Sequence, residues 1–271
     1  MDLRRLIGVV PLLQRRDLIF LESAPDVLGH DPKPHPDGAA QFGGSNGDSV
    51  VHAEQIANKR LAWKPVRACY RAPMCNLYRQ RNTEDLSRLF DAHPLELPFE
   101  ARPDIYPKYE AVVVRKEAGE RRLECMAWGI VRTMAGKSGK PVKKAITNVR
   151  NLDSPFWKST VADPAQRCLV PFTSFAEPRP GKDPETGRPA NWWFTIEGGQ
   201  GCAFAGIWRL SDGARRFAFL TCEPNPLVAP LHPKAMPVIL HPEDYDSWLD
   251  GEAADACSLA QPFPSQLMRV A

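Results

Sequence analysis

A cysteine directly follows a methionine at Met74-Cys75, and this order could generate a free N-terminal cysteine. If translation starts at Met74 and the methionine is removed, Cys75 carries an α-amine with a reference pKa of about 7.7 to 8.0. Its thiol, on the adjacent carbon, has a reference pKa near 8.5. Such an aminothiol traps aldehydes, because the amine forms a Schiff base and the sulfur then closes a five-membered thiazolidine ring. Taken alone, a cysteine after a methionine is more often a small buried hydrophobic residue.

Three further polar residues stand at the edges of expected strands or helices, namely Asn148, Glu177 and His232. Together with Cys75 they would supply a nucleophile, an orienting amide and two groups for proton transfer. Each also has an ordinary interpretation. Asn148 could be a turn or cap residue, Glu177 the end of a strand, and His232 a surface histidine or a satisfied core histidine.

The elements that must position these residues are mostly strands. Asn82 is a typical cap before Thr83-Glu84-Asp85, and Leu86, Leu89 and Phe90 predict a short helix after it. Two runs around a glycine-containing turn, Ala111–Arg115 and Arg122–Trp128, predict a hairpin. Further strands are expected at Ala145–Asn148, Arg167–Val170, Trp192–Glu197, Ala203–Leu210, Phe217–Cys222 and Val238–Leu240. Short helices are expected at Ser154-Pro155, at Asn225-Pro226 and from His241-Pro242 to Leu249, where proline follows a polar residue.

Composition limits the class of protein. With 43% hydrophobic and 25% charged residues, the 271-residue chain is typical of a soluble globular protein, and we expect it in the cytoplasm. The apolar run Leu6–Leu13 contains Pro11 and is too short for a membrane span, so no membrane partner is expected. Seven dispersed cysteines without a C-x-x-C pair predict reduced thiols and no metal site. No phosphate-binding glycine motif is present, and no cofactor is expected.

Basic residues are concentrated in one stretch of an otherwise balanced chain. From Val131 to Leu152 the sequence contains six basic residues and no acidic one: Arg132, Lys137, Lys140, Lys143, Lys144 and Arg150. The stretch is a candidate nucleic-acid surface. On charge alone, a solvated glycine and lysine loop is the simpler interpretation.

Taken together, these segments resemble one family, the SOS-response-associated peptidase (SRAP) family, which shields abasic sites in single-stranded DNA. Nine blocks occur in family order over residues 74 to 271: Met74-Cys75-Asn76-Leu77-Tyr78, Met126-Ala127-Trp128-Gly129, Thr147-Asn148-Val149-Arg150-Asn151, Ser154-Pro155-Phe156-Trp157, Arg167-Cys168-Leu169-Val170-Pro171, Ser174-Phe175-Ala176-Glu177, Phe204-Ala205-Gly206-Ile207-Trp208, Thr221-Cys222-Glu223-Pro224-Asn225 and His232-Pro233-Lys234-Ala235-Met236-Pro237-Val238-Ile239-Leu240. The resemblance implies an α+β domain, an antiparallel β-barrel-like SRAP fold with short peripheral helices.

The resemblance also implies roles for single residues. Cys75 would be the mature N-terminus that bonds to the ring-opened sugar aldehyde. Asn148 would hold the α-amine or the sugar, Glu177 would move protons during ring opening and Schiff-base formation, and His232 would be a second acid/base near the sugar hydroxyl. DNA contacts are expected from five residues: Asn76, Lys143, Lys144, Arg150 and Trp157. Among these, the Arg150 fork suits a phosphate and Trp157 would flank a base.

The sequence departs from the commoner family pattern at three places. Asn76-Leu77 stands where Gly-Arg is more usual, which removes one basic DNA contact. Pro178 replaces an aromatic residue after Glu177, and Asp104-Ile105-Tyr106-Pro107 replaces an asparagine-containing loop. These changes resemble those of a bacterial subgroup.

Residues 1–73 do not have the pattern of a folded domain. The segments Asp31–Gly38 and Gly43–Gly47 are rich in proline or glycine, and no helical or strand period persists between them. We expect a disordered or non-native extension, with the functional start at Met74 and one domain over residues 74–271. Processing after Met74, including autocleavage by the Cys75 thiol, is the alternative.

The expected function is recognition of abasic single-stranded DNA by a monomer that forms a covalent crosslink through Cys75. A cysteine peptidase that uses Cys75 with His232 and either Glu177 or Asn148 is a rival interpretation. A non-catalytic binder of single-stranded nucleic acid is another. Only the crosslinking chemistry requires that the cysteine follow methionine, and a simple binder would need neither Cys75 nor Glu177.

Overall fold

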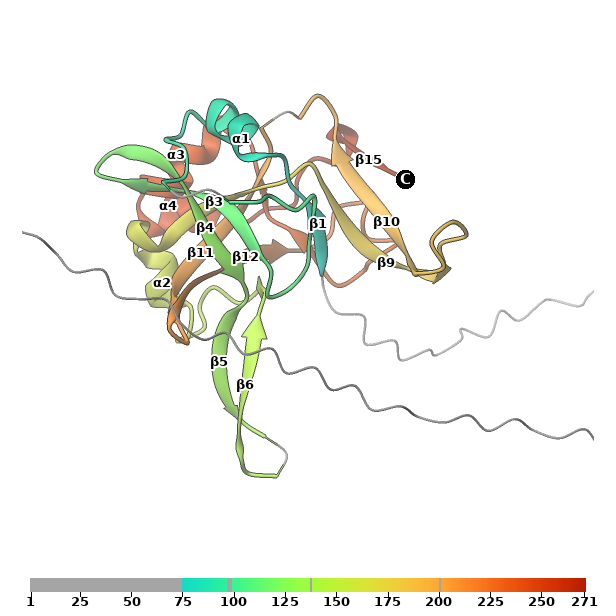
Figure 1. The fold of residues 1–271 in the computed structure, drawn as a ribbon, viewed down its shortest axis with the longest axis horizontal. Helices are drawn as coiled ribbons and strands as arrows, with labels where there is room; N and C mark the ends of the chain where they lie inside the picture. The colour runs from blue at the N-terminus through green and yellow to red at the C-terminus, as the bar shows by residue number, and fades with distance from the viewer. Residues whose placement is uncertain (1–74, 97–98, 137, 200) are drawn as a thin grey trace, which may run out of the picture. The chain divides into compact units, whose positions relative to one another are not determined.

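The structure is a computed structural model of the chain, and it describes residues 75–96, 99–136, 138–199 and 201–271 (Figure 1). The expected extension over residues 1–73, and Lys137, lie outside the described residues. No helix in the described ranges is long and apolar enough to cross a membrane.

Five strands form a closed barrel: β3 (Glu110–Glu117), β4 (Glu120–Trp128), β8 (Arg167–Pro171), β11 (Ala203–Ser211) and β12 (Ala214–Cys222). The order around the ring is β12-β4-β3-β8-β11, and β11 pairs again with β12. The expected α+β class with a barrel and short helices is confirmed. The seam between β12 and β4 is parallel, with Phe217 opposite Trp128, and the other four seams are antiparallel. A closed ring of five strands requires at least one parallel seam, because strand directions cannot alternate all the way around an odd number of strands.

Local sequence signals explain the predicted hairpin in this barrel. Strands β3 and β4 pair antiparallel up to Glu117 opposite Glu120, which leaves a two-residue turn. Both turn residues, Ala118 and Gly119, have positive φ, at 51° and 85°. That is the turn whose twist suits a two-residue hairpin loop.

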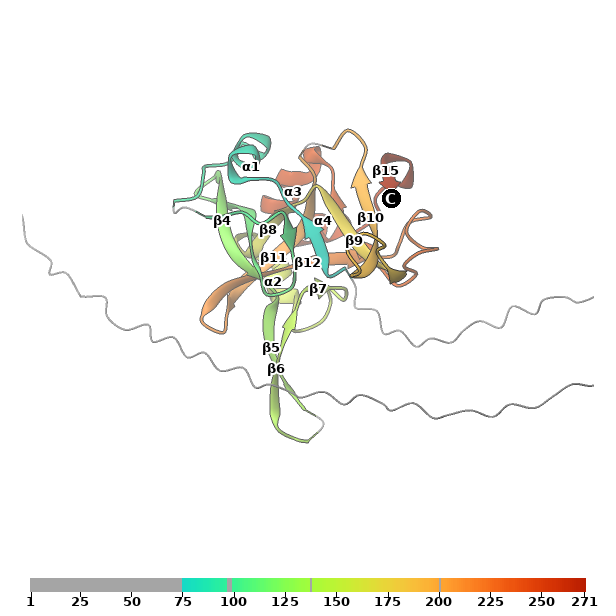
Figure 2. The same ribbon diagram turned by 45° about the vertical axis from the view of Figure 1, so that its right-hand side comes forward.

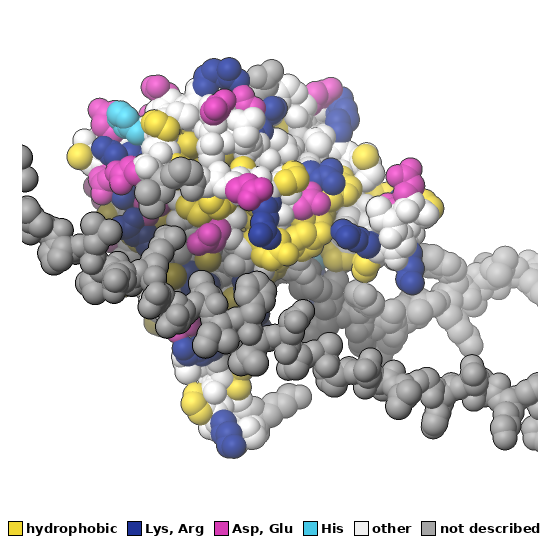
Figure 3. Space-filling view, viewed as in Figure 1, with side chains coloured by type: hydrophobic (Ala, Val, Ile, Leu, Met, Phe, Trp, Pro, Cys, Tyr) yellow, Lys and Arg dark blue, Asp and Glu magenta, His cyan; other side chains and the backbone are white. Residues whose placement is uncertain are grey.

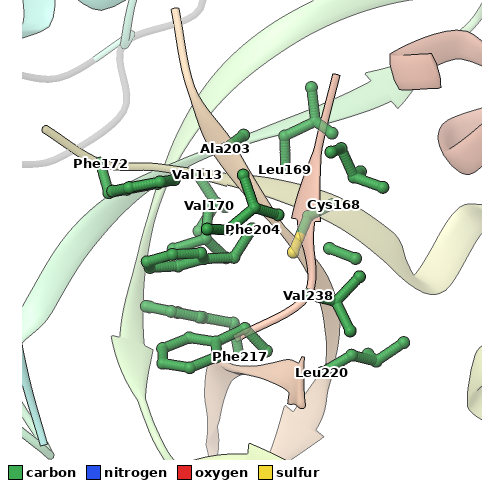
Figure 4. Close-up of a cluster of buried hydrophobic side chains, with 14 of the residues drawn as sticks. Val113, Cys168, Leu169, Val170, Phe172, Ala203, Phe204, Phe217, Leu220 and Val238 are labelled. Carbon is green, nitrogen blue, oxygen red and sulfur yellow. The ribbon is translucent and has the colours of Figure 1, made fainter. Parts of the chain in front are cut away.

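The barrel interior is packed with aromatic and aliphatic side chains (Figure 4). Phe172 stacks on Phe204 with ring centroids 4.0 Å apart, and Trp128 stacks on Phe219 at 5.2 Å. Tyr78, which follows the candidate cysteine closely in the chain, meets the Trp128 ring edge-on at 5.2 Å. The segment that carries Cys75 is therefore anchored in the core.

A second sheet has the strand order β15-β10-β9-β1-β2. Its strands are β1 (Leu77–Arg79), β2 (Asp104–Ile105), β9 (Ser174–Lys182), β10 (Pro189–Ile196) and β15 (Met268–Val270). In the antiparallel pair of β1 with β9, Leu77 lies opposite Ala176. This register brings the start of β1 beside Glu177.

A two-stranded arm and three very short strands complete the strands of the described residues. The arm consists of β5 (Ile130–Ala135) and β6 (Pro141–Ile146), so the basic stretch forms a ribbon and is not a simple loop. Strand β7 (Asn148–Val149) follows directly and pairs parallel with β12. Strands β13 (Met236–Pro237) and β14 (Ile239–Leu240) pair with β12 and β11, so the expected strand at Val238–Leu240 is broken into two pieces.

In the part of the chain that the structure describes, four α-helices and three 3-10 turns lie outside the strands: α1 (Thr83–Phe90), α2 (Lys158–Ala162), α3 (Tyr245–Asp250), α4 (Ala253–Ser258), η1 (Pro164–Gln166), η2 (Pro242–Asp244) and η3 (Ser265–Leu267). Helix α1 confirms its prediction, since the Asn82 side chain accepts from the Asp85 nitrogen at 2.8 Å. The helix expected at Ser154-Pro155 begins only at Lys158, after a turn. The helix expected at Asn225-Pro226 was wrong.

Asn225 explains why no helix forms at that place. Its side-chain oxygen accepts from the nitrogens of Leu227 and Val228, while its amide donates to the Phe263 carbonyl at 2.7 Å. The side chain thus closes a turn and ties it to the C-terminal segment, and the backbone does not continue as a helix.

Candidate active site

Four elements from distant parts of the chain bring the predicted residues together. Cys75 directly precedes Asn76 and β1, Glu177 lies in β9, Asn148 begins β7, and His232 lies in the turn before β13. Figure 2 shows the short β7 near the start of β1. All four side chains are buried or half-buried, so the site is held within the folded domain.

One contact of the site joins Cys75 and Glu177. The backbone nitrogen of Cys75 donates a hydrogen bond to the Glu177 carboxyl group. Glu177 is only 1% exposed, and this burial raises its pKa from 4.5 to about 8, although the bond from Cys75 acts in the opposite direction. A carboxyl group with a pKa near 8 exists in both protonation states around neutral pH, so it can both donate and accept a proton.

His232 faces the other oxygen of the same carboxyl group. Its Nδ1 lies 2.9 Å from the carbonyl oxygen of Ala235, which can only accept, so Nδ1 carries a proton. Its Nε2 lies 3.7 Å from Glu177 Oε2. Among the described residues, neither of these two buried atoms has a hydrogen-bond partner. The gap between them is too long for a good hydrogen bond and leaves both atoms available to a substrate.

Asn148 contacts the other end of the Cys75 residue. Its amide nitrogen lies 3.5 Å from the Cys75 carbonyl oxygen and 3.0 Å from Thr147 Oγ1. The Thr147 carbonyl in turn accepts from Trp128 Nε1 at 3.1 Å, which fixes this segment to the barrel. Asn148 therefore orients the main chain of Cys75.

The Cys75 thiol is buried and not preformed as a thiolate. Burial, followed by the charge of Glu177, raises its pKa well above the ordinary value. The sulfur lies 3.8 Å from the Leu77 carbonyl oxygen. In the described ranges, no group of three His, Cys, Asp or Glu side chains could hold a metal ion.

The residues expected to contact DNA differ in their exposure and in their partners. Arg150 forms an ion pair with the exposed Glu223. Lys143 and Lys144 are exposed on β6, and Lys143 pairs with Asp212. Trp157 is only 7% exposed and packs at 4.4 Å against Phe156, and its contact with a DNA base stays a prediction.

Asn76 lines a groove of about 560 Å³ beside the site. Sequence reasoning missed the cationic residues of this groove: Arg79, Arg179, Lys182 and Arg188. The Arg79 guanidinium lies 3.9 Å from the ring centroid of Trp193, so the groove also has an aromatic wall. Three of the four cations belong to the β9–β10 hairpin, where the charges alternate with prolines and a helical or strand period is hard to see.

The sequence model of the family described as SOS response associated peptidase (SRAP) matches residues 74–271. The chain belongs to this family. Membership in the SRAP family supports a function associated with the SOS response and with abasic sites. A comparison with curated proteins finds no match.

Solved structures with the SRAP fold are similar over most of the chain. A protein from Bordetella bronchiseptica is 25% identical, with a TM-score of 0.57, over 73% of this chain and 98% of that chain. A protein from Bacteroides thetaiotaomicron is 17% identical, with a TM-score of 0.56, over 72% of this chain and 90% of that chain. A phage-related protein from Bordetella bronchiseptica is 20% identical, with a TM-score of 0.52, over 73% and 92%. The last two bear on the fold alone.

Proposed function

We propose that the protein recognises abasic sites in single-stranded DNA and forms a covalent thiazolidine crosslink through Cys75. The observation that carries this proposal is the hydrogen bond from the Cys75 nitrogen to the Glu177 carboxyl group. The proton-transfer group of the site thus faces the nitrogen of Cys75. Schiff-base chemistry requires acid/base help at this atom.

The chemistry needs Cys75 to be the first residue. In a chain that continues upstream, the Cys75 nitrogen is an amide and cannot attack an aldehyde. We propose that the working protein starts at Cys75, either because translation begins at Met74 and the methionine is removed or because the chain is cut there. Residues 74–271 are then the functional domain, and residues 1–73 are an extension that must be absent.

The proposed reaction proceeds in two stages and releases one water. The α-amine of Cys75 adds to the C1 aldehyde of the ring-opened sugar and forms a C–N bond, which gives a carbinolamine. Protonated Glu177 donates a proton to the carbinolamine hydroxyl, water leaves, and an iminium forms. The sulfur then bonds to the same carbon, the thiol proton returns to the Glu177 carboxylate, and the thiazolidine ring is complete.

His232 assists at the sugar. Its Nε2 faces the same carboxyl group as the Cys75 nitrogen. A histidine can exchange a proton with the sugar hydroxyl when the ring opens, and it can run the reverse step on release. Asn148 keeps the Cys75 carbonyl, and with it the amine, in place.

The thiol argues against a cysteine peptidase. A peptidase needs a thiolate, which a neighbouring cation or histidine normally stabilises. Here burial raises the pKa of the Cys75 thiol, and His232 Nε2 faces Glu177. A neutral thiol suits a sulfur that attacks second, after the iminium has formed. A non-catalytic binder would have no use for the buried carboxyl group beside the cysteine nitrogen.

We test the proposal with the chain expressed from Met74, after intact mass has shown that Cys75 is the first residue. Incubation with a single-stranded oligonucleotide that carries one abasic site should give a denaturation-resistant adduct, with the mass of protein plus DNA minus one water. The full-length chain, once intact mass has shown that it remains uncut and that its Cys75 nitrogen is an amide, is the matched control and should give none. An equal yield of adduct from both proteins would overturn the proposal.

A further inference from the structure

The groove of about 560 Å³ lies on the face of the second sheet that is turned away from Glu177. Successive side chains of a strand point to opposite faces of a sheet. Ala176 and Pro178 line the groove, so Glu177 between them points to the other face. In the same way Trp193 lines the groove, and Trp192, which lies opposite Glu177, does not. A ligand in the groove and a nucleotide at the Glu177 carboxyl group would therefore contact different faces of the sheet.

One end of the groove, the apolar end, is formed by four side chains: Leu77, Tyr106, Ala176 and Trp193. The strand register brings them together, because Ala176 lies opposite both Leu77 on β1 and Trp193 on β10. Tyr106 directly follows β2, which pairs with β1, and it is 38% exposed. Figure 3 shows hydrophobic and basic side chains next to one another over β1, β9 and β10.

The other end, the cationic end, consists of Lys182 and Arg188 on the two sides of the β9–β10 turn. Both side chains are exposed, and Pro189 lies opposite Lys182. Between Pro189 and Trp193 the strand extends about 13 Å, at about 3.3 Å per residue. The groove therefore has room for about four residues of an extended peptide between its two ends.

The charges of the groove are compensated at the apolar end and not at the cationic end. The Arg79 guanidinium, at the apolar end, lies 2.7 Å from Asp104 Oδ1. Within the described ranges, neither Lys182 nor Arg188 has a carboxylate at ion-pair distance. Positive charge without a partner at one end of a groove suits a ligand that is acidic at the matching end.

The acidic residues of the β9–β10 turn do not neutralise this end. Asp183 Oδ1 accepts hydrogen bonds from the Thr186 nitrogen at 2.7 Å and from Thr186 Oγ1 at 2.8 Å, so this oxygen closes the turn. Glu185 is exposed and is not part of the groove lining.

The aromatic side chains of the groove favour a peptide over single-stranded DNA. Proteins hold single strands by stacking bases on aromatic faces and by placing cations along the backbone. Here the Arg79 guanidinium lies 3.9 Å from the Trp193 ring centroid, so a base stacked there would have to displace it. The two unpaired cations also lie together at one end. Separate apolar and acidic parts are a property of peptides and not of a uniformly charged strand.

We propose that this groove binds an acidic peptide segment of a partner protein. Its carboxylates pair with Lys182 and Arg188, and an aromatic or aliphatic side chain contacts Tyr106 and Trp193 at the apolar end. Aromatic anchors and arginine are the residues that most often dominate such interfaces. The inference goes beyond the proposed function and does not depend on the crosslink.

The test uses fluorescein-labelled hexapeptides of one composition, with three aspartates and one residue each of glycine, leucine and phenylalanine. One peptide has the aspartates together before Gly-Leu-Phe, one has the reverse order, and one alternates acidic with other residues. A further peptide has asparagine in place of aspartate. Fluorescence anisotropy measures the Kd of each for the full chain and for the form that starts at Cys75.

We expect one of the two block orders to bind about fivefold or more tightly than the alternating and asparagine peptides, the range of one or two exposed ion pairs. Lys182→Gln/Arg188→Gln should lose this advantage because the carboxylates lose their partners. Tyr106→Ser should weaken the block peptide by about fivefold through the lost aromatic contact. The charge-matched control is Arg88→Gln/Lys158→Gln, which removes two exposed cations on α1 and α2 and should behave like the wild type. Thermal unfolding checks that each variant is folded.

Three results from the peptides would overturn the inference: equal Kd values for the block and alternating peptides, no change in the groove variants, or an equal loss in the control. Binding by the Cys75 start alone would also overturn it, since the segment before Cys75 would then be the occupant.

A measurement with DNA separates the groove from the candidate site. Both groove variants, made with the Cys75 start, should form the adduct with abasic single-stranded DNA at the wild-type rate. A loss of single-strand binding in Lys182→Gln/Arg188→Gln would make the groove a DNA surface and overturn the inference. Absence of any adduct from the wild-type protein would contradict the proposed function and leave the peptide result as it stands.

Discussion

The Glu177 carboxyl group accepts a hydrogen bond from the Cys75 backbone nitrogen, and its other oxygen lies 3.7 Å from His232 Nε2. One buried carboxyl group therefore stands between the nitrogen of the cysteine and the imidazole. A substrate bound between them can exchange a proton with this carboxyl group, which makes Glu177 the first residue to vary.

Glu177→Gln should slow adduct formation by about one to three orders of magnitude, in the range of lost general acid/base catalysis. The amide keeps the size of the side chain and cannot supply the proton that releases water from the carbinolamine. The measurement is a crosslinking time course from pH 5 to 9 with the Cys75 start. The matched control is Glu197→Gln on the surface, where the carboxylate pairs with Arg269. Wild-type rates in Glu177→Gln would remove this residue from the mechanism.

The same substitution should stabilise the fold at alkaline pH. Burial raises the pKa of Glu177 from 4.5 to about 8, so between these values the folded chain retains a proton that the unfolded chain has lost. The wild-type free energy of unfolding therefore decreases as the pH rises from 4.5 to about 8, because of Glu177. Above pH 8 this group causes no further decrease. Relative to the wild type, Glu177→Gln should gain on the order of 5 kcal/mol between pH 4 and pH 8.5, or roughly 15 °C in Tm. Thermal unfolding of both chains at the two pH values checks this. A constant difference would contradict it.

His232→Ala should slow both the formation and the reversal of the adduct and leave the final yield unchanged. Catalysis of a reversible step changes the two rates and not the equilibrium. Formation is followed directly, and reversal is followed by transfer to an excess of unlabelled abasic DNA. His93→Ala, which removes an exposed imidazole beside Glu120, is the control. A changed final yield with unchanged rates would show a structural role instead.

Cys75→Ala should abolish the stable adduct, because the ring can no longer close. Cys75→Ser should leave at best a weaker and reversible link, since serine keeps the amine and offers a poorer nucleophile at neutral pH. Gel analysis after denaturation, with and without borohydride, separates a trapped imine from a closed ring. A full yield from Cys75→Ala without borohydride would contradict the thiazolidine.

Arg150→Ala and Glu223→Gln should act on DNA binding in opposite directions. The Arg150 guanidinium is paired with Glu223, so a phosphate must compete with that carboxylate. Loss of Arg150 should weaken binding to single strands of any sequence and lower the salt slope by about 0.7. Loss of the Glu223 charge should tighten binding about two- to fivefold, the range of an exposed ion pair. Fluorescence anisotropy over a salt series measures both, and tighter binding by Arg150→Ala would place the phosphate elsewhere.

Local signals predicted the parts of the fold that depend on neighbouring residues. The Asn82 cap and the Ala118-Gly119 turn each act within a few residues, so the helix and the hairpin could be recognised. The three-residue β1 and the two-residue β7 are too short to show a period, and they are the elements that bring Cys75 and Asn148 to the site. The prediction that the four site residues lie close together rested on the order of the family blocks in the sequence.

Other features depend on contacts that no local pattern contains. The burial of Trp157 results from packing against Phe156 and beside Arg209, whose guanidinium lies 5.2 Å from the ring centroid. The arm was interpreted as a loop because its charges and glycines hide the strand alternation. The Arg150 pair with Glu223 joins two blocks that are far apart in the chain.

The parallel seam of the barrel also bears on how the chain folds. It joins β4 and β12, and β12 then receives β7, whose first residue is Asn148. Pairings between such distant segments form late, because closing a long loop costs entropy before any contact is gained. Asn148 therefore reaches Cys75 only when the last seam closes. We expect a newly made or partly folded chain to carry an unreactive cysteine, so that reactivity toward an aldehyde develops together with the native state.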